Sequence, residues 1–168
     1  MKKNYLFYLA SIMISACMVF ASCGDDEDEV TLDINPAGVY IGTTYTNLNS
    51  RGTDISIDTT YNQPITIREN HQGQLELVYH NWTDHQNINY GDFTIVPLTV
   101  TKKANGVALS GECTDSLYKG ERGFLATLSA EGTIIGEEKA AALKLKIDLP
   151  VTPAMTLKFA LTYNGIAQ

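Results

Sequence analysis

The feature that most constrains the fold is a strict alternation of apolar and polar residues near the C-terminus. Between 143 and 149, every odd position is Leu or Ile and every even position is Lys or Asp. A period of two places the odd side chains on one face of a β-strand and the even side chains on the other. The segment therefore predicts a strand with one buried face, which needs further strands beside it to be stable.

The same period recurs through the chain from Gly38 onward, with turn residues between the segments. The pattern predicts eight strands, at 38–47, 63–69, 74–80, 92–102, 107–113, 122–130, 143–149 and 155–163. Residues 70–73 end in Gly73 and predict a hairpin turn, and Asn105-Gly106 predicts another. Pro97 cannot donate a ladder hydrogen bond, so we expect a bulge or an edge position there. Residues 137–143 favour helix formation and predict a short helix.

Consecutive strands joined by short turns predict an all-β domain over residues 36–168, arranged as an eight-stranded antiparallel up-and-down barrel. Closure removes the unpaired edges that promote aggregation. The interior of such a barrel holds either side chains or one small ligand. The residues expected to point inward are medium to large, which favours a filled interior: Leu75, Leu77, Leu145, Ile147, Leu157, Phe159 and Leu161.

The N-terminus has the features of a secretory signal. Lys2 and Lys3 precede an apolar run over residues 5–20, and small residues follow it. The run is somewhat longer than usual for a signal peptide, so an uncleaved membrane anchor is the alternative. About 20 apolar residues are normally needed to span a bilayer, and we therefore interpret residues 1–22 as a signal peptide.

The end of this run resembles a lipobox, in which small residues precede a cysteine that receives a diacylglyceryl group. Phe20-Ala21-Ser22-Cys23 fits this pattern, and Ile14-Ser15-Ala16-Cys17 fits it as well. We favour Cys23 because polar sequence begins directly after it, whereas Cys17 is followed by more apolar residues. The membrane would then be a partner through the N-terminal lipid, since acyl chains contribute about 0.8 kcal/mol per buried CH₂.

Residues 23–35 form an acidic tether after the predicted lipidation site. Its five consecutive acidic residues repel one another and favour an extended, solvated spacer. The cluster also resembles the surface-export signal of Bacteroides-type lipoproteins, which implies an outer-membrane protein that faces the cell exterior. The cluster consists of Asp25, Asp26, Glu27, Asp28 and Glu29.

The charge and cysteine content exclude two classes of protein. Removal of residues 1–22 takes away two lysines and leaves ten basic and 19 acidic residues, a net charge of −9. Nucleic-acid binding depends on cations that neutralise phosphates, so we expect no nucleic-acid partner. If Cys17 is removed and Cys23 is lipidated, Cys113 is left without a partner, and a framework of intramolecular disulfides is excluded.

The tether, the lipobox, the strand spacing and the opening from Pro36 to Thr43 resemble the calycin-like (lipocalin-like) domain of Bacteroides-type lipoproteins, over about residues 36–164. Gly38-x-Tyr40 resembles the lipocalin Gly-x-Trp motif, with Tyr in place of Trp. The wider calycin group binds small, often apolar ligands inside the barrel. The resemblance implies the same fold and implies no established activity.

A candidate recognition site lies in the connection at 80–91. This segment is polar, yet it holds the only Trp of the chain. Amphipathic aromatics beside amides suit sugar stacking, so we name Trp82, His85, Tyr90 and the motif residue Tyr40 as candidate ligand-binding residues. The alternative is that Trp82 closes the end of the barrel as packing.

Two short segments resemble the O-glycosylation signal of Bacteroides-type secreted proteins, in which Asp and Ser or Thr precede an apolar residue or Thr. Asp58-Thr59-Thr60 and Asp115-Ser116-Leu117 fit it, with Thr59 and Ser116 as acceptors. Both segments fall in connections between predicted strands.

No enzyme motif is present in the sequence. It contains no Gly-x-Ser-x-Gly nucleophile elbow, no phosphate-binding glycine loop and no Cys-x-x-Cys. The three histidines are interpreted as surface residues, so we expect no metal, no cofactor and no catalysis. We expect a surface-exposed binding lipoprotein for a small apolar molecule or a glycan. The alternative is a structural or protein-interaction module with a filled barrel, whose protein partner the sequence leaves unknown.

Overall fold

The computed structural model describes residues 33–50, 53–84 and 86–168, and within these ranges the regular structure is entirely β. The strands are β1 (Gly38–Ser50), β2 (Thr53–Glu69), β3 (Leu75–Thr83), β4 (Asn89–Ile95), β5 (Thr99–Lys103), β6 (Gly106–Lys119), β7 (Arg122–Ile135), β8 (Ala140–Thr152) and β9 (Met155–Ala167).

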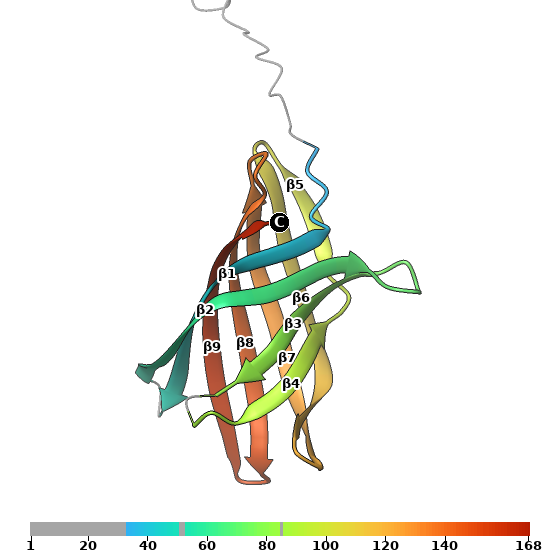
Figure 1. The fold of residues 1–168 in the computed structure, drawn as a ribbon. Helices are drawn as coiled ribbons and strands as arrows, with labels where there is room; N and C mark the ends of the chain where they lie inside the picture. The colour runs from blue at the N-terminus through green and yellow to red at the C-terminus, as the bar shows by residue number, and fades with distance from the viewer. Residues whose placement is uncertain (1–32, 51–52, 85) are drawn as a thin grey trace, which may run out of the picture. The chain divides into compact units, whose positions relative to one another are not determined.

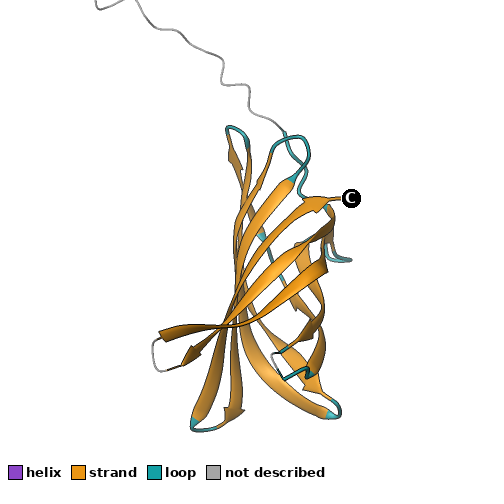
Figure 2. Ribbon diagram, turned by 60° about the vertical axis from the view of Figure 1, so that its left-hand side comes forward, coloured by secondary structure: helices purple, strands orange, loops and turns teal. Residues whose placement is uncertain are grey.

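All nine strands belong to one antiparallel sheet in the order β4-β3-β2-β1-β9-β8-β7-β6-β5. Consecutive strands pair with each other, except that β1 pairs with β9 and that β4 and β5 lie at the two ends of the order. The sheet is strongly curled, so that β3 and β4 cross over the long strands β6 to β8 in Figure 1, and Figure 2 shows the same curl from the side. The concave side of the curled sheet forms the core.

The predicted alternation is confirmed in β8, where Leu143, Leu145, Ile147 and Leu149 are at most 1% exposed. All the residues expected to point inward are buried or half-buried in the core. The hairpin turn before β3 is also confirmed. Gly73 adopts a φ of +76°, which L side chains disfavour, and its N–H donates to the carbonyl of Asn70 at 3.0 Å.

The prediction of a closed eight-stranded barrel is confirmed only in part. The segment 92–102 forms two strands, and among the described residues no strand pairing joins the two ends of the sheet, which is strongly curled and not closed. β4 ends at Ile95 and β5 begins at Thr99, with Pro97 between them. Pro97 has no N–H to donate, so the ladder is interrupted there, as the proline predicted. The chain passes closely over Gly111 of β6, where an added Cβ would lie 2.7 Å from the carbonyl oxygen of Pro97. Glycine at this position allows the crossing.

The predicted helix at 137–143 is wrong. The chain turns at Gly136, where φ is +72°, and β8 begins at Ala140. Ala140, Ala141 and Ala142 pair with β7, and Ala141 and Ala142 also pair with β9. A helix of seven residues is marginal in isolation. The hydrogen bonds available from two neighbouring strands therefore outweigh the helical preference of these residues.

Two further boundaries differ from the predictions. β2 begins at Thr53, ten residues before the expected start, and β3 continues to Thr83 through the segment expected to be a loop. The connection from β3 to β4 is correspondingly short. It is organised by Asp84, whose Oδ1 accepts hydrogen bonds from the N–H groups of Gln86 and Ile88 at 2.8 and 3.0 Å.

Candidate functional site

Trp82 lies on β3, where its backbone pairs with Gly91 of β4, and its side chain is only 1% exposed. The indole stacks on the ring of Tyr90 with a centroid separation of 4.8 Å and meets the edge of Phe159 at 5.1 Å. Its Nε1 has no hydrogen-bond partner among the described residues. A stacking platform for a ligand needs an exposed ring face, and both faces of Trp82 are covered.

Tyr90 and Tyr40, two of the other candidate ligand-binding residues, are likewise in packing positions. Tyr90 is 6% exposed, its hydroxyl donates to Asp84 Oδ2 at 3.3 Å, and burial raises its pKa to about 12. Tyr40 is fully buried and donates to the carbonyl of Pro36 at 2.6 Å. The structure thus brings Trp82 and Tyr90 together, Tyr40 shares none of their ring contacts, and His85 lies outside the described residues. Residues 80–83 and 89–91 lie in strands and not in a loop, and the ring contacts of Trp82 favour the alternative that it is a packing residue.

The rest of the interior is occupied by large side chains. Tyr79 stacks on Phe93 at 4.9 Å and donates to Thr44 Oγ1 at 3.1 Å. The phenol of Tyr163 covers Gly165, and burial raises the pKa of Tyr163. A ligand-sized cavity would leave accessible surface on the residues that line it. The largest core residues instead have less than 2% of their surface accessible, among them Trp82, Tyr40, Tyr79, Tyr163, Phe93 and Phe159.

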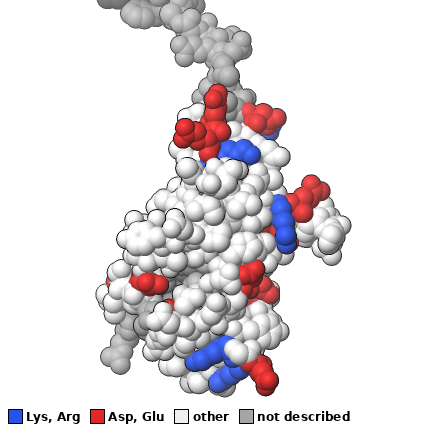
Figure 3. Space-filling view, viewed as in Figure 1, with Lys and Arg blue, Asp and Glu red and all other residues white. Residues whose placement is uncertain are grey.

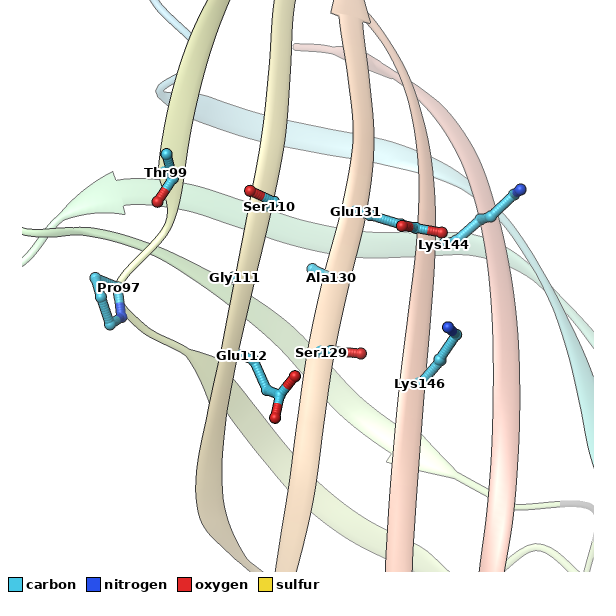
Figure 4. Close-up of a pocket in the computed structure, with 10 residues that line it drawn as sticks. All are labelled: Pro97, Thr99, Ser110, Gly111, Glu112, Ser129, Ala130, Glu131, Lys144 and Lys146. Carbon is cyan, nitrogen blue, oxygen red and sulfur yellow. The ribbon is translucent and has the colours of Figure 1, made fainter.

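The largest depression that we describe lies on the outer wall and has a volume of about 510 Å³. We call it the outer groove; Figure 4 shows its side chains on four neighbouring strands, β5 to β8. Strand register arranges them in two rows, Ser110 beside Glu131 beside Lys144, and Glu112 beside Ser129 beside Lys146. Each row offers a carboxylate, a hydroxyl and an ammonium group. Such a surface provides both donors and acceptors to a polar partner.

The outer groove was not identified from the sequence. The alternation in β8 predicted that Lys144 and Lys146 point outward, and they do. The neighbouring residues in each row come from β7, 13 and 17 residues earlier in the chain, and from β6, 34 residues earlier. The register of β6, β7 and β8 determines which side chains meet in the groove, and no pattern within a single segment of the sequence indicates that register.

A second depression, of about 400 Å³, lies on the outer wall nearer the start of β1 and the end of β9. It forms part of a band of outward-facing apolar residues that crosses five strands, which we call the apolar stripe. Ile41 pairs with both Pro64 and Ile166, and Ile135 pairs with Ala140. The stripe consists of Val39, Ile41, Pro64, Ile135, Ala140, Ala142 and Ile166.

A polar network on β2, β3 and β4 was also missed in the sequence. His80 Nδ1 lies 2.9 Å from Asp92 Oδ2, and His80 Nε2 lies 2.9 Å from Thr66 Oγ1. The N–H of Asn81 donates to Asp92 Oδ1 at 2.8 Å, and this bond and the His80 ring hold the pKa of Asp92 below its usual range. Thr66 lies mid-strand with β1 and β3 on either side. The network therefore joins three strands.

The predicted modification sites are in strands and not in loops. Thr59 lies on β2 opposite Tyr45 and is half-buried, whereas Ser116 lies on β6 opposite Leu125 and is exposed. Cys23 and the acidic residues Asp25 to Glu29 lie outside the described residues. Within the described ranges, no group of three or more His, Cys, Asp or Glu residues is placed to hold a metal ion.

Comparison with known proteins assigns the fold to a family. Residues 37–166 match the family described as the calycin-like β-barrel domain. The chain belongs to this family. The resemblance drawn from residues 36–43 and the strand spacing is therefore confirmed, and calycin-like proteins are typically non-catalytic binding proteins.

A solved structure shares this calycin-like fold. It is the crystal structure of a Bacteroides fragilis protein described as a "putative outer membrane protein", with 14% identity and a TM-score of 0.58. The match covers 77% of this chain and 50% of that chain, so the chain spans about half the length of the structure it matches. A comparison with the curated proteins gave no match. The residues that the structure describes contain no helix long and apolar enough to cross a membrane.

Proposed function

We propose that this calycin-like chain is a lipid-anchored, non-enzymatic module of the outer membrane that binds a protein partner through its outer wall. The observation that carries the proposal is the filled interior. Trp82, Phe159 and the other core aromatics occupy the space in which calycins hold small ligands. Recognition then falls to the outside of the sheet, where the outer groove is the largest depression we describe.

The chemistry of the outer groove favours a protein over a glycan. Sugar sites combine hydroxyl hydrogen bonds with an aromatic surface for stacking, and no aromatic side chain lines the groove. Glu112, Glu131, Lys144 and Lys146 instead present charges of both signs in a fixed order. Complementary charges on a protein surface fix the orientation of the partner and exclude partners with the wrong charge order.

The anchoring part of the proposal comes from the sequence and from the family. Cys23 would carry the lipid, and Asp25 to Glu29 would direct export to the cell surface. The similar Bacteroides fragilis structure is described as a "putative outer membrane protein", and this description supports a location in the outer membrane. The domain would then stand at the membrane with its outer wall available to other proteins.

The test is site-specific photocrosslinking of the full chain in its native host. A photoreactive amino acid at Ser129, within the outer groove, is expected to give a discrete protein adduct. The same residue at Leu125, which also points outward from β7, is the matched control and should give none. Glu131→Lys should abolish the adduct because it places three lysines together and removes the order of charges.

Three other outcomes would overturn the protein-binding role. Specific retention of a sugar on a glycan array, lost in Glu131→Lys, would assign the groove to a glycan. A lipophilic molecule that copurifies and is released by organic solvent would show that the interior opens for a ligand. An adduct of the same size from both Ser129 and Leu125 would indicate crowding and not a site.

Thr59 and Ser116 remain our proposed glycan acceptors. The intact mass of the protein from its native host should exceed the lipidated mass by glycan increments. Thr59→Ala and Ser116→Ala should each remove one increment. Ser116 is exposed on a strand, so it is the more accessible acceptor of the two.

A further inference from the structure

The apolar stripe is continuous across the outer wall at one end of the domain. Val39, Ile135 and Ile166 have 45%, 48% and 49% of their surfaces exposed, although they are large and apolar. They lie on β1, β7 and β9. Ile41 pairs with Ile166 and Ile135 pairs with Ala140, and these four residues line one depression on the outer wall. A contiguous apolar band on a solvent-exposed face marks a surface that contacts another apolar phase or molecule.

On the side of the stripe toward the middle of the strands, the adjacent row of outward-facing residues contains no charged residue. The next outward positions are Thr43, Thr133 and Asn164, and charges begin only with Glu131 and Lys144. Figure 3 shows, on the face it presents, charged side chains that are scattered with broad uncharged areas between them. On this side of the stripe, apolar residues are followed by uncharged polar residues before the charges begin, which is the order of polarity found from the acyl region of a bilayer to its interface.

The N-terminal segment fixes the place where the tether joins the domain. Asp33 forms an ion pair with Lys102 at 2.8 Å, and Lys139 Nζ donates to the carbonyl of Ala37 at 3.2 Å. Lys139 directly precedes Ala140, a member of the stripe. The tether therefore reaches the domain at the same end as the stripe, five residues before β1 begins with Gly38.

The covalent reach of the tether limits how far the stripe can lie from the lipid. Ten peptide steps separate Cys23 from Asp33, which span at most about 35 Å when fully extended. A domain held at that distance meets the bilayer at a high effective concentration, so even a weak apolar contact is populated. A stable dimer buries about 20–30 residues on each side, and the stripe has only the seven members defined above.

We propose that the apolar stripe docks the domain on the lipid surface, so that only the stripe ends of β1, β7, β8 and β9 rest against the bilayer. The inference rests on the proposed lipid at Cys23 and adds a defined orientation of the domain. The stripe residues enter the interfacial region of the bilayer, as the apolar face of a monotopic element does. Glu137 and Glu138, in the turn beside the stripe, then lie at the level of the headgroups.

The test uses the full lipidated chain in phosphatidylcholine vesicles whose acyl chains carry bromine. Cys113→Ser removes the free thiol of the domain while keeping a donor to the carbonyl of Thr94. A bimane label is placed on Ile166→Cys or Ile135→Cys, with Leu125→Cys as the control. Leu125 is an exposed apolar residue on the same strand as Ile135, ten residues and about 33 Å away.

The labels at 166 and 135 should shift to shorter emission wavelengths and lose intensity to the brominated lipid, and the label at 125 should do neither. Ile166→Glu should abolish the quenching at 135, because a carboxylate resists entry into the acyl region. Unquenched labels at 166 and 135 would overturn the docking. A wavelength shift without bromine quenching would also overturn it and would indicate that a second copy covers the stripe. Flotation with the vesicles reports the lipid anchor separately, so loss of flotation would reject the anchor and not the stripe.

Discussion

The carboxylate of Asp115 accepts a hydrogen bond from the backbone N–H of Thr94 at 3.0 Å, across the line where β4 meets β6. The thiol of Cys113 donates to the carbonyl of the same Thr94 at 3.3 Å. Strand pairing does not join β4 to β6 among the described residues. Two inward side chains of β6 therefore take the place of a ladder and hold the curled sheet together.

Asp115→Ala should lower the free energy of unfolding by about 1–3 kcal/mol, because the N–H of Thr94 loses its acceptor. Asp115→Asn keeps an oxygen acceptor and should cost less, which makes it the matched control. Chemical denaturation measures both. Amide hydrogen exchange at Thr94 should accelerate in Asp115→Ala before other amides of β4, and unchanged exchange there would show that the seam does not depend on this bond.

Trp82→Ala should lower the free energy of unfolding by about 3–5 kcal/mol, because it leaves a cavity among Tyr90, Phe93 and Phe159. Tyr61→Ala is the control, since Tyr61 is 72% exposed and its loss should change stability by less than about 0.5 kcal/mol. Unfolding in urea should be followed by circular dichroism, because Trp82 is the only Trp and the variant therefore has no tryptophan fluorescence. A loss of less than about 1 kcal/mol in the free energy of unfolding would contradict the packing role and make Trp82 a candidate recognition residue again.

Asp92 should make a small contribution to stability that depends on pH. Its pKa is lowered in the folded state, mainly by the N–H of Asn81 and also by His80. The contribution is therefore complete above the unfolded carboxyl pKa of about 3.9 and is lost as the pH falls through the lower folded value. Asp92→Asn should melt below the wild type at neutral pH, with the difference narrowing in acid. Because the side chain of Asp92 is 51% exposed, the effect on stability should be modest.

Cys23→Ser should abolish incorporation of labelled fatty acid and leave the protein unprocessed or released. The reason is that the thioether to the lipid can form only at the cysteine that follows the cleavage site. Acyl labelling that persists until Cys17 is also replaced would show that Cys17 is the modified residue.

Neutral substitutions from Asp25 to Glu29 should leave acyl labelling intact but reduce cleavage by external protease on whole cells. Asn and Gln replacements keep the length of the segment and remove only its charge. Equal proteolysis of the wild type and the variant would mean that the acidic run serves only as a spacer.

A strand could be predicted where one of its faces is buried and the other is exposed to solvent, as in β8. Pro97 could also be interpreted correctly, since its missing N–H acts at its own position. The start of β2 was missed because Thr53 to Tyr61 is exposed or half-buried, so its outward and inward residues differ little. The helix predicted at 137–143 failed because two neighbouring strands supply hydrogen bonds that the local sequence does not report.

The candidate site was less predictable than the fold. The polarity of residues 80–91 indicated a loop, yet Asp84 satisfies the backbone of a tight connection and leaves Trp82 and Tyr90 in the core. The outer groove depends on which residues of β6 and β7 stand beside Lys144 and Lys146. That register is set by the whole sheet and is invisible in any single segment.

β5 leaves one side of its backbone without a neighbouring strand, and all five of its residues are exposed. A protein anchored in a membrane is concentrated in two dimensions, where copies collide far more often than in solution, and an open strand is then a template for assembly. β5 is short and ends in Lys102 and Lys103, so another chain that paired with it would gain few hydrogen bonds and would have to desolvate two ammonium groups. The short, basic edge would thus limit self-association under the crowded conditions that the proposed anchor creates.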